Sequence, residues 1–247
     1  MGTHDRAGPR GRQHLKVRLK TAKQRTASSQ RWLERQLNDP YVAAARREGY
    51  RSRAAYKLIE IDAKHRLLRP GRRVVDLGAA PGGWSQVAAG RVRSLEGSGQ
   101  VVAIDLLPME PIPGVVFLQG DFMDEAAPGR LQALLREGTA DLVLSDMAAQ
   151  GIGHSRTDHL RIMALAEAAA EFAIEVLAPG GAFLCKTFQG GSERALLVRL
   201  KEAFASVRHI KPPASRAESA ELYVSATQFR GLPGQAARRA GRPEAAK

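Results

Sequence analysis

The sequence predicts an α/β fold, a doubly wound and mostly parallel sheet of seven strands with helices on both faces. Three observations predict it. Short apolar segments of strand length alternate with longer segments of helical length. A glycine-rich turn follows the first apolar segment, and acidic residues follow several of the others. Such alternation is typical of parallel sheets whose crossover helices cover both faces.

The elements follow one another in a regular order. Residues 32–68 are predicted to be helical, and Arg69-Pro70-Gly71 ends this region. A helix stop and a turn are predicted at residues 177–181, Leu-Ala-Pro-Gly-Gly. Strands are predicted at residues 74–76, 101–105, 115–119, 142–145, 182–186, 207–211 and 222–227, with helices at 84–95, 124–137, 158–177 and 192–204.

The net charge of +13 is concentrated at the two ends of the chain. Residues 1–36 hold ten Lys or Arg against two acids, and residues 230–247 hold five against one, which leaves +1 for residues 37–229. We therefore predict one catalytic domain at 37–229 between a disordered basic arm, 1–36, and a basic tail, 230–247. Basic arms usually contact polyanions, above all nucleic acid, although a solubilising role is the plainer alternative.

A second basic cluster lies inside the predicted domain. Residues 46–73 contain ten Lys or Arg and only three acids, with Tyr50 and Tyr56 interleaved. This composition suits a folded phosphate-binding surface, and a solvated helix face is the alternative.

Composition also excludes several classes of protein. The single cysteine, Cys185, rules out an internal disulfide framework and a zinc knuckle, and is expected to be a small core residue. No apolar segment approaches the length of a membrane-spanning helix, and no secretory leader is recognisable. We expect a cytoplasmic protein without membrane association, and nothing indicates more than a monomer.

The glycine-rich turn in residues 74–86, VVDLGAAPGGWSQ, predicts a Rossmann-like nucleoside pocket. Asp76 lies at the carboxyl end of the preceding strand. A dinucleotide fingerprint needs a second glycine where this chain has Ala80, followed by Pro81, and no Gly-Lys-Ser/Thr of a P-loop occurs. The turn thus favours a nucleoside ligand without pyrophosphate. S-adenosylmethionine fits, because its carboxylate suits the positive start of the next helix.

Other polar residues fall where ligands bind in such folds. Asp105, Asp121 and Asp146 each come at or just after a predicted strand, although one such Asp alone would be as consistent with helix capping. Lys186 follows an otherwise apolar strand, and lysine is rarely buried without a partner. Trp84 at the helix start is predicted either to wall the ligand or to pack in the core.

Several segments carry a family resemblance over roughly residues 46–229. The chain resembles the FtsJ/RrmJ-type bacterial ribosomal RNA large subunit 2′-O-ribose methyltransferases. The resemblance implies a catalytic tetrad of Lys57, Asp146, Lys186 and Glu221, and cofactor contacts at Gly82, Trp84, Asp105, Asp121 and Asp146. The matching segments are residues 51–58, 74–86, 104–109, 117–122, 145–148, 177–181 and 186–190.

The chain departs from the family pattern after Asp146. The family commonly continues Asp-Met-Ala-Pro-Asn, whereas this chain has Ala149-Gln150 and then the insertion GIGHSRT at residues 151–157. His154, Asp158 and His159 could also indicate a metal site. This is the weaker interpretation, because these residues do not supply three convincing ligands. We expect no metal, and expect Thr157 or Asp158 to cap the next helix.

The resemblance implies an enzyme that transfers a methyl group from S-adenosylmethionine to a ribose 2′-hydroxyl. Lys186 would act as the base or as an orienting group, with Asp146 and Glu221 positioning the two lysines and the hydroxyl. The implied substrate is a uridine of the A loop in 23S ribosomal RNA, within the 50S subunit. Two alternatives stay open: a 2′-O-methyltransferase acting on another RNA such as transfer RNA, and an RNA-binding ribosome assembly factor without turnover.

Overall fold

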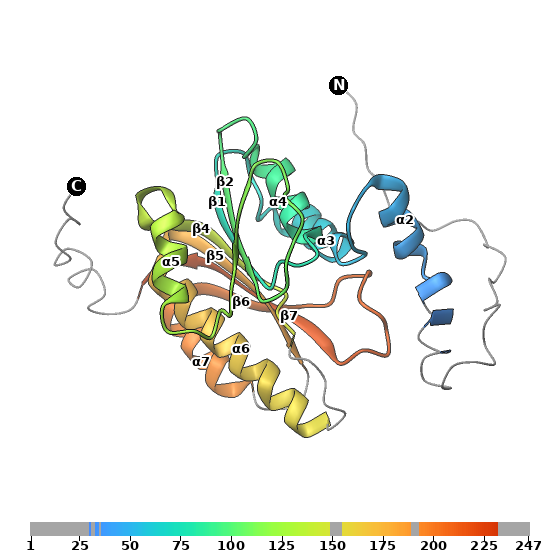
Figure 1. Ribbon diagram of the computed structural model, residues 1–247. Coiled ribbons are helices and arrows are strands. Elements are labelled where there is room, and N and C mark those ends of the chain that lie inside the picture. The colour runs from blue at the N-terminus through green and yellow to red at the C-terminus, as the bar shows by residue number, and fades with distance from the viewer. Residues whose placement is uncertain (1–29, 31–32, 35, 149–154, 189–192, 232–247) are drawn as a thin grey trace.

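A computed structural model describes residues 30, 33–34, 36–148, 155–188 and 193–231. Its centre is one seven-stranded sheet in the order β3-β2-β1-β4-β5-β7-β6 (Figure 1). All pairings are parallel except those of β7, which runs antiparallel to both β5 and β6. The predicted mostly parallel α/β sheet is confirmed. The strands are β1 (Arg73–Leu77), β2 (Gln100–Asp105), β3 (Val115–Gln119), β4 (Ala140–Ser145), β5 (Leu177–Phe188), β6 (Phe204–Ile210) and β7 (Glu221–Phe229).

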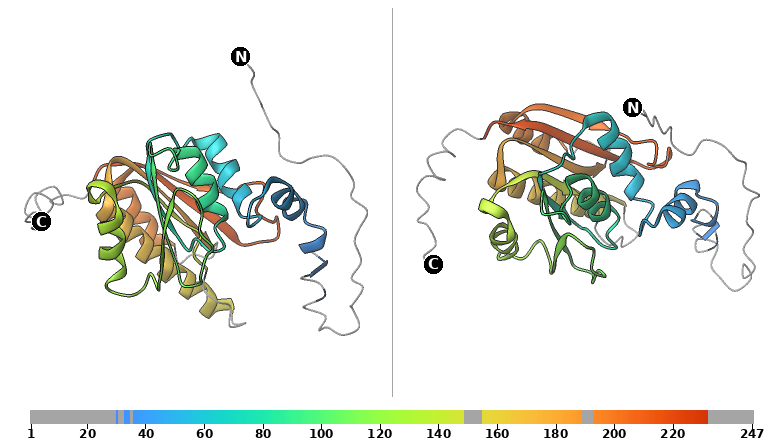
Figure 2. Two further views of the ribbon diagram at one scale, coloured as in Figure 1. Left: turned by 45° about the horizontal axis from the view of Figure 1, so that its top comes forward. Right: turned by 90° about the horizontal axis from the view of Figure 1, so that it is seen from above.

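Helices cover both faces of this sheet (Figure 2). One face packs against α3 (Ala55–His65) and α4 (Gly83–Val92), with Leu58, Val87 and Leu144 in their shared core. The opposite face packs against α5 (Ala127–Leu134), α6 (Ser155–Val176) and α7 (Arg194–Ala203), with Phe172 and Phe183 in that core. Apolar residues thus point alternately to the two faces along strands that are buried on both sides.

The region predicted to be helical, residues 32–68, contains two separate helices, α2 (Pro40–Glu48) and α3. Asp39 accepts a hydrogen bond from the backbone N–H of Tyr41 and caps α2, which Gly49 ends at a φ of 78°. Helix α3 then ends at His65, and Arg66 takes a left-handed conformation at its end. Helix α2 lies against α3 on the side away from the sheet (Figure 1).

Two other boundaries differ from those predicted. Helix α6 begins at Ser155, so Thr157 and Asp158 lie inside it and neither of them is the capping residue. Strand β5 begins at Leu177, where a turn was predicted, although Gly180 does take a positive φ of 79°. The β4–β5 register shifts between Ala140 and Leu142, and this irregularity accommodates the Pro-Gly-Gly segment within the strand.

The strand order reverses between β1 and β4. Strands β2 and β3 lie to one side of this point and β5, β7 and β6 lie to the other. In doubly wound sheets, a ligand crevice forms outside the carboxyl ends of the strands at such a reversal. The residues at that edge therefore define where to look for a site.

Candidate active site

Asp146 and the buried Lys186 form an ion pair beside the strand reversal. Asp146 directly follows β4, and Lys186 lies on the neighbouring strand β5 with 7% of its surface exposed. The Lys186 Nζ atom lies 3.1 Å from the Asp146 Oδ1 atom and donates a 2.6 Å hydrogen bond to the Asp146 backbone carbonyl. Lysine has three N–H donors, so two of them are directed at Asp146 and one direction remains.

Lys57 and Glu221 form a second ion pair from distant parts of the chain. Lys57 lies in the first turn of α3, Glu221 is the first residue of β7, and the Lys57 Nζ atom is 2.8 Å from the Glu221 carboxylate. Lys57 is 8% exposed. The four residues of the expected tetrad are therefore arranged as two lysine–carboxylate pairs.

Tyr223 connects the two pairs. It lies two residues after Glu221 on β7, and it is the cross-strand partner of Lys186 on β5. Its hydroxyl donates a 2.8 Å hydrogen bond to the Asp146 Oδ1 atom, while the Lys57 Nζ atom lies 5.7 Å from the ring centroid. Burial and the neighbouring Asp146 carboxylate raise the pKa of Tyr223 well above its usual value, so the hydroxyl keeps its proton.

The sequence prediction missed Tyr223, although a signal for it exists. Side chains at positions i and i+2 of a strand point to the same face, so Glu221 and Tyr223 lie on the same face of the last strand. Tyr223 was therefore a candidate site residue, because it neighbours the predicted catalytic Glu221 on that face.

The glycine-rich turn approaches its neighbours too closely for any side chain. A Cβ atom at Gly78 would lie 2.7 Å from the Cγ atom of Met147, and Gly78 has a φ of 76°. A Cβ atom at Gly82 would lie 2.6 Å from Ile112, and Gly82 has a φ of 110°. Only glycine fits such positions without strain. Gly82 is also the N-cap of α4, which has no side-chain cap, so the start of α4 keeps backbone N–H groups available to an anion.

Asp105 and Asp121 lie at the same edge of the sheet. Asp105 ends β2 and accepts hydrogen bonds from the backbone N–H groups of Ala80 and Leu107, both at 2.8 Å. Asp105 thus holds the glycine-rich turn in place from the carboxyl end of β2. Asp121 follows β3, is exposed, and accepts a 2.9 Å bond from the Met123 N–H.

Trp84 is a core residue. Its side chain is 3% exposed, its indole N–H donates a 2.8 Å hydrogen bond to the Ala54 carbonyl, and its ring packs on Tyr223 at a centroid distance of 5.6 Å. Of the two roles considered for this side chain, packing is the one observed. A contact from Trp84 to a cofactor would therefore have to come from its backbone.

Asp76 is the one acidic residue of the glycine-rich segment at residues 74–86, and the pKa of its carboxyl group is strongly raised. It is fully buried at the end of β1, where one oxygen accepts a 2.6 Å hydrogen bond from the Ser85 hydroxyl. Its Oδ1 atom has no hydrogen-bond partner among the described residues. Burial, with a smaller contribution from the nearby Asp146 and Asp105 carboxylates, raises the pKa of Asp76 to about 7 despite the lowering effect of the Ser85 hydrogen bond.

The basic cluster at residues 46–73 does not form one surface. Arg46 and Arg47 are exposed on α2, whereas Lys64 and Arg66 are exposed at the far end of α3, toward the start of β1. Four of its arginines are committed to partners within the domain: Arg51, Arg53, Arg72 and Arg73. The predicted phosphate-binding surface is thus reduced to separate groups of exposed residues.

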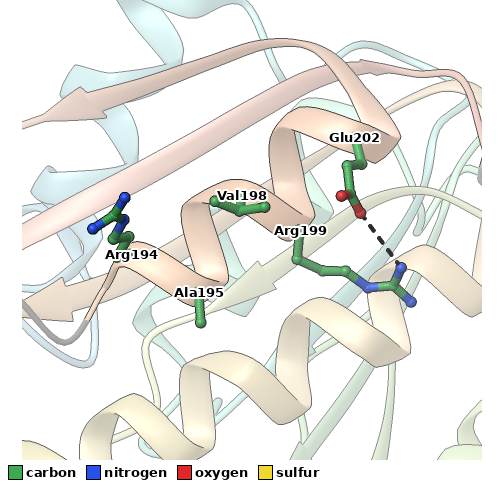
Figure 3. Close-up of a pocket in the computed structure, with 5 residues that line it drawn as sticks. All are labelled: Arg194, Ala195, Val198, Arg199 and Glu202. Carbon is green, nitrogen blue, oxygen red and sulfur yellow. Dashed lines mark ion pairs between the residues drawn. The ribbon is translucent and has the colours of Figure 1, made fainter.

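A hollow on the outer side of α7 is separate from this site. Arg194, Ala195, Val198, Arg199 and Glu202 line it, and Arg199 lies 3.9 Å from Glu202 (Figure 3). None of these residues belongs to the tetrad or the glycine-rich turn.

The described residues contain no group of three or more potential metal-ligating side chains. His154 of the alternative metal site lies outside the described residues. Within that same part of the chain, no helix combines the length and apolar character needed to cross a membrane.

Comparison with known proteins assigns this architecture to a family. The model of the FtsJ-like methyltransferases matches residues 50–229. The chain belongs to the FtsJ-like methyltransferase family. The matched range of the FtsJ-like family includes both ion pairs and the glycine-rich turn.

Close relatives of this FtsJ-like chain carry one name. A protein of Xanthobacter autotrophicus is 66% identical over 224 residues, which cover 91% of this chain and 87% of that protein. A protein of Azorhizobium caulinodans is 64% identical over 217 residues, which cover 88% of this chain and 90% of the relative. Both are named ribosomal RNA large subunit methyltransferase E.

A solved structure is also similar. A Plasmodium falciparum protein described as a ribosomal RNA methyltransferase is 33% identical, with a TM-score of 0.66. The match covers 74% of this chain and all of that chain. The expected fold, the family and the class of enzyme are thus confirmed, whereas the roles of individual site residues remain predictions.

Proposed function

We propose that this protein transfers a methyl group from S-adenosylmethionine to the ribose 2′-hydroxyl of a uridine in the A loop of 23S ribosomal RNA, within the large ribosomal subunit. The observation that carries the proposal is the pair of buried lysine–carboxylate contacts, Lys57–Glu221 and Lys186–Asp146, at the strand reversal of an FtsJ-like methyltransferase. Lysine is rarely buried without a partner, and buried charged groups at the ligand-binding edge of such a sheet are typical of functional sites. The names of the close relatives support ribosomal RNA as the substrate.

The glycine-rich edge fits S-adenosylmethionine as the methyl donor. The start of α4 has no side-chain cap and suits the carboxylate of the donor, while the buried Asp76 Oδ1 atom has no hydrogen-bond donor among the residues that the structure describes. Gly82, Trp84 through its backbone, Asp105, Asp121 and Asp146 are the proposed contacts. When bound, the donor supplies an electrophilic methyl group and leaves as a neutral sulfide.

The residues of this chain would orient the ribose hydroxyl and take its proton. With two N–H groups of Lys186 directed at Asp146, its third direction is available to the hydroxyl oxygen. In its neutral form, Lys186 has a lone pair in this third direction. That lone pair would accept the hydroxyl proton while the new C–O bond forms. Lys57 would hold a neighbouring part of the ribose or phosphate, fixed by Glu221. Orientation by these buried groups lowers the entropy cost of reaching the in-line geometry.

The test is to incubate the full-length protein with methyl-tritiated S-adenosylmethionine and one of three substrates. These are large subunits from cells lacking the endogenous modification, 23S ribosomal RNA extracted from them, and bulk transfer RNA. Digestion to nucleosides and mass spectrometry then identify the methylated ribose. Lys186→Ala is the inactive variant, and Lys64→Ala, an exposed lysine on α3, is the matched control.

We expect label in one uridine of 23S ribosomal RNA with the wild type and with Lys64→Ala. Label only in transfer RNA would refute the proposed substrate in favour of a related RNA methyltransferase. Tight binding to ribosomal RNA without any label would support a non-catalytic assembly factor instead. A comparison of intact subunits with extracted RNA also shows which of the two the protein recognises.

A further inference from the structure

We propose that Arg51 and Arg53 act as internal positioning residues, with Arg51 holding the cofactor-side loop and Arg53 holding the loop that leads into Glu221. The two arginines flank Ser52 in the segment 51–58 and come from the basic cluster predicted to bind phosphate. Their side chains instead reach two different loops of the domain. This inference rests on the proposed function and assigns each arginine to one half of the site.

The Arg51 guanidinium binds backbone carbonyl groups from two segments around the glycine-rich turn. It donates hydrogen bonds to the carbonyls of Glu110 at 2.5 Å, Pro111 at 2.8 Å and Pro81 at 3.4 Å. A guanidinium can reach several carbonyls at once because its five donors form a rigid planar fork.

The loop that Arg51 holds covers Gly82. The Sδ atom of Met109 and the Cδ1 atom of Ile112 would lie 2.9 and 2.6 Å from a Cβ atom there, and the Cδ atom of Arg51 itself would lie 3.3 Å away. The loop and the start of α4 therefore share one packing surface. Release of the loop would change the part of the site proposed to hold S-adenosylmethionine.

Arg53 holds the loop between β6 and β7. It donates a 2.6 Å hydrogen bond to the Ala214 carbonyl and forms a 3.0 Å ion pair with Asp39, which also lies 3.3 Å from Arg216 of the same loop. On the other side of this peptide segment, the Ala214 N–H donates a 2.6 Å hydrogen bond to the Glu60 carboxylate. Both backbone groups of Ala214 are therefore fixed from α3 and the segment before it.

Ser215 carries this constraint to the tetrad. Its buried hydroxyl donates a 2.8 Å hydrogen bond to the Glu221 Oε1 atom, and Glu221 in turn binds Lys57. Arg53 thus acts on Glu221 through Ala214 and Ser215, over two hydrogen bonds and the peptide bond between those two residues. The guanidinium hydrogen bonds of Arg51 within the described part of the chain go to Pro81, Glu110 and Pro111 instead, so the two arginines should give different kinetic signatures.

The experiment compares Arg51→Lys and Arg53→Lys in the full-length protein, with Arg47→Gln as the control. Lysine keeps the charge and loses the fork, so it should rescue a phosphate contact and fail to rescue a positioning role. Three quantities are measured for each variant. Calorimetry gives the affinity for S-adenosylmethionine, and steady-state kinetics gives kcat with the RNA that the wild type methylates. The affinity for that RNA is measured across a series of salt concentrations. Circular dichroism and melting temperature verify that each variant folds.

We expect Arg51→Lys to weaken S-adenosylmethionine binding about tenfold while kcat at saturating donor stays within about twofold. Arg53→Lys should lower kcat about tenfold with unchanged donor affinity. Both should keep the wild-type salt slope of RNA binding. Arg47→Gln should keep the wild-type affinity for S-adenosylmethionine. The salt slope of its RNA binding should fall by about one if Arg47 contacts a phosphate.

Wild-type donor affinity in Arg51→Lys, or wild-type kcat in Arg53→Lys, would overturn the corresponding half of the inference. If the wild type methylates no RNA, the proposed function fails, and calorimetry still decides the role of Arg51. The role of Arg53 is then decided by a crystal structure of Arg53→Lys. An unchanged Glu221–Lys57 pair there would overturn it, and a displaced Glu221 carboxylate would support it. Should Arg53→Lys not fold, Ser215→Ala tests the same connection by the same readouts.

Discussion

The Lys186–Asp146 pair and the Lys57–Glu221 pair contain the same two kinds of group, but different parts of the fold build them. Lys186 lies on β5, and Asp146 directly follows the neighbouring parallel strand β4. Lys57 and Glu221 are 164 residues apart in sequence and meet where a helix crosses the start of β7. The first pair is fixed by sheet register, whereas the second also needs contacts from outside the sheet.

This difference suggests a division of labour. Backbone hydrogen bonds on both sides of a central strand hold its residues with little freedom. Residues at a helix start and a strand start depend on loops, which open more readily. We therefore expect chemistry to depend most on the sheet-built pair, and orientation of the RNA to depend on the other.

Lys186→Ala should have the largest effect and tests the first half of this comparison. Loss of an acid–base group typically costs about 10²–10⁴-fold in rate, and we expect a fall of about 10³-fold in kcat. Calorimetry should show unchanged S-adenosylmethionine affinity. Full activity in this variant would remove Lys186 from the chemistry and leave the comparison without its basis.

Asp76→Asn tests the electrostatics around the Lys186–Asp146 pair, and the measured quantity is the pH dependence of stability. With its pKa raised to about 7 from 3.8, the folded state binds this proton more tightly than the unfolded state. Stability from this group is therefore present at low pH and is lost as pH rises between about 4 and 7. One pKa unit corresponds to about 1.4 kcal/mol, so the loss from pH 5 to pH 7 is on the order of 2–3 kcal/mol.

The measurement for Asp76 is urea unfolding of the wild type and Asp76→Asn from pH 5 to pH 8. The amide cannot ionise, so the variant should lose this component of the pH dependence. Parallel stability curves for the two proteins would show that Asp76 ionises normally in the folded state.

Glu221→Gln should have a smaller effect than Lys186→Ala. The amide keeps the shape and a hydrogen-bond acceptor but removes the charge that holds Lys57. We expect a fall in kcat of about 30-fold, or about 2 kcal/mol, with donor affinity unchanged. Steady-state kinetics with saturating donor measures it. A loss equal to that of Lys186→Ala would show that the two pairs act as one unit.

Tyr223→Phe should have the smallest effect and tests the link between the pairs. The ring stays against Trp84, while the hydrogen bond to Asp146 is lost. A hydrogen bond of this kind contributes about 1 kcal/mol, so kcat should fall about fivefold. The double variant with Glu221→Gln reports coupling. Additive losses would show that Tyr223 does not connect the two pairs.

Much of this protein could be predicted from its sequence because the signals are local. Apolar segments of strand length predicted the sheet, and the segment 74–86 predicted the tight turn, since Gly78 and Gly82 do take positive φ values. Family resemblance supplied the four tetrad residues, which the structure does bring together in two pairs. The region predicted to be helical, residues 32–68, does contain α2 and α3, but Gly49 ends α2 and separates the two helices.

Tertiary structure decided what these residues contact. Nothing local in the sequence indicates that Arg51 and Arg53 bind backbone carbonyls at Glu110 and Ala214, because those partners lie 59 and 161 residues away. The same applies to Ser215, whose bond to Glu221 depends on the path of a loop. The sequence by itself determined the order of strands and helices and the chemical groups available. Only long-range packing decided which charges are paired inside the domain and which remain for a partner.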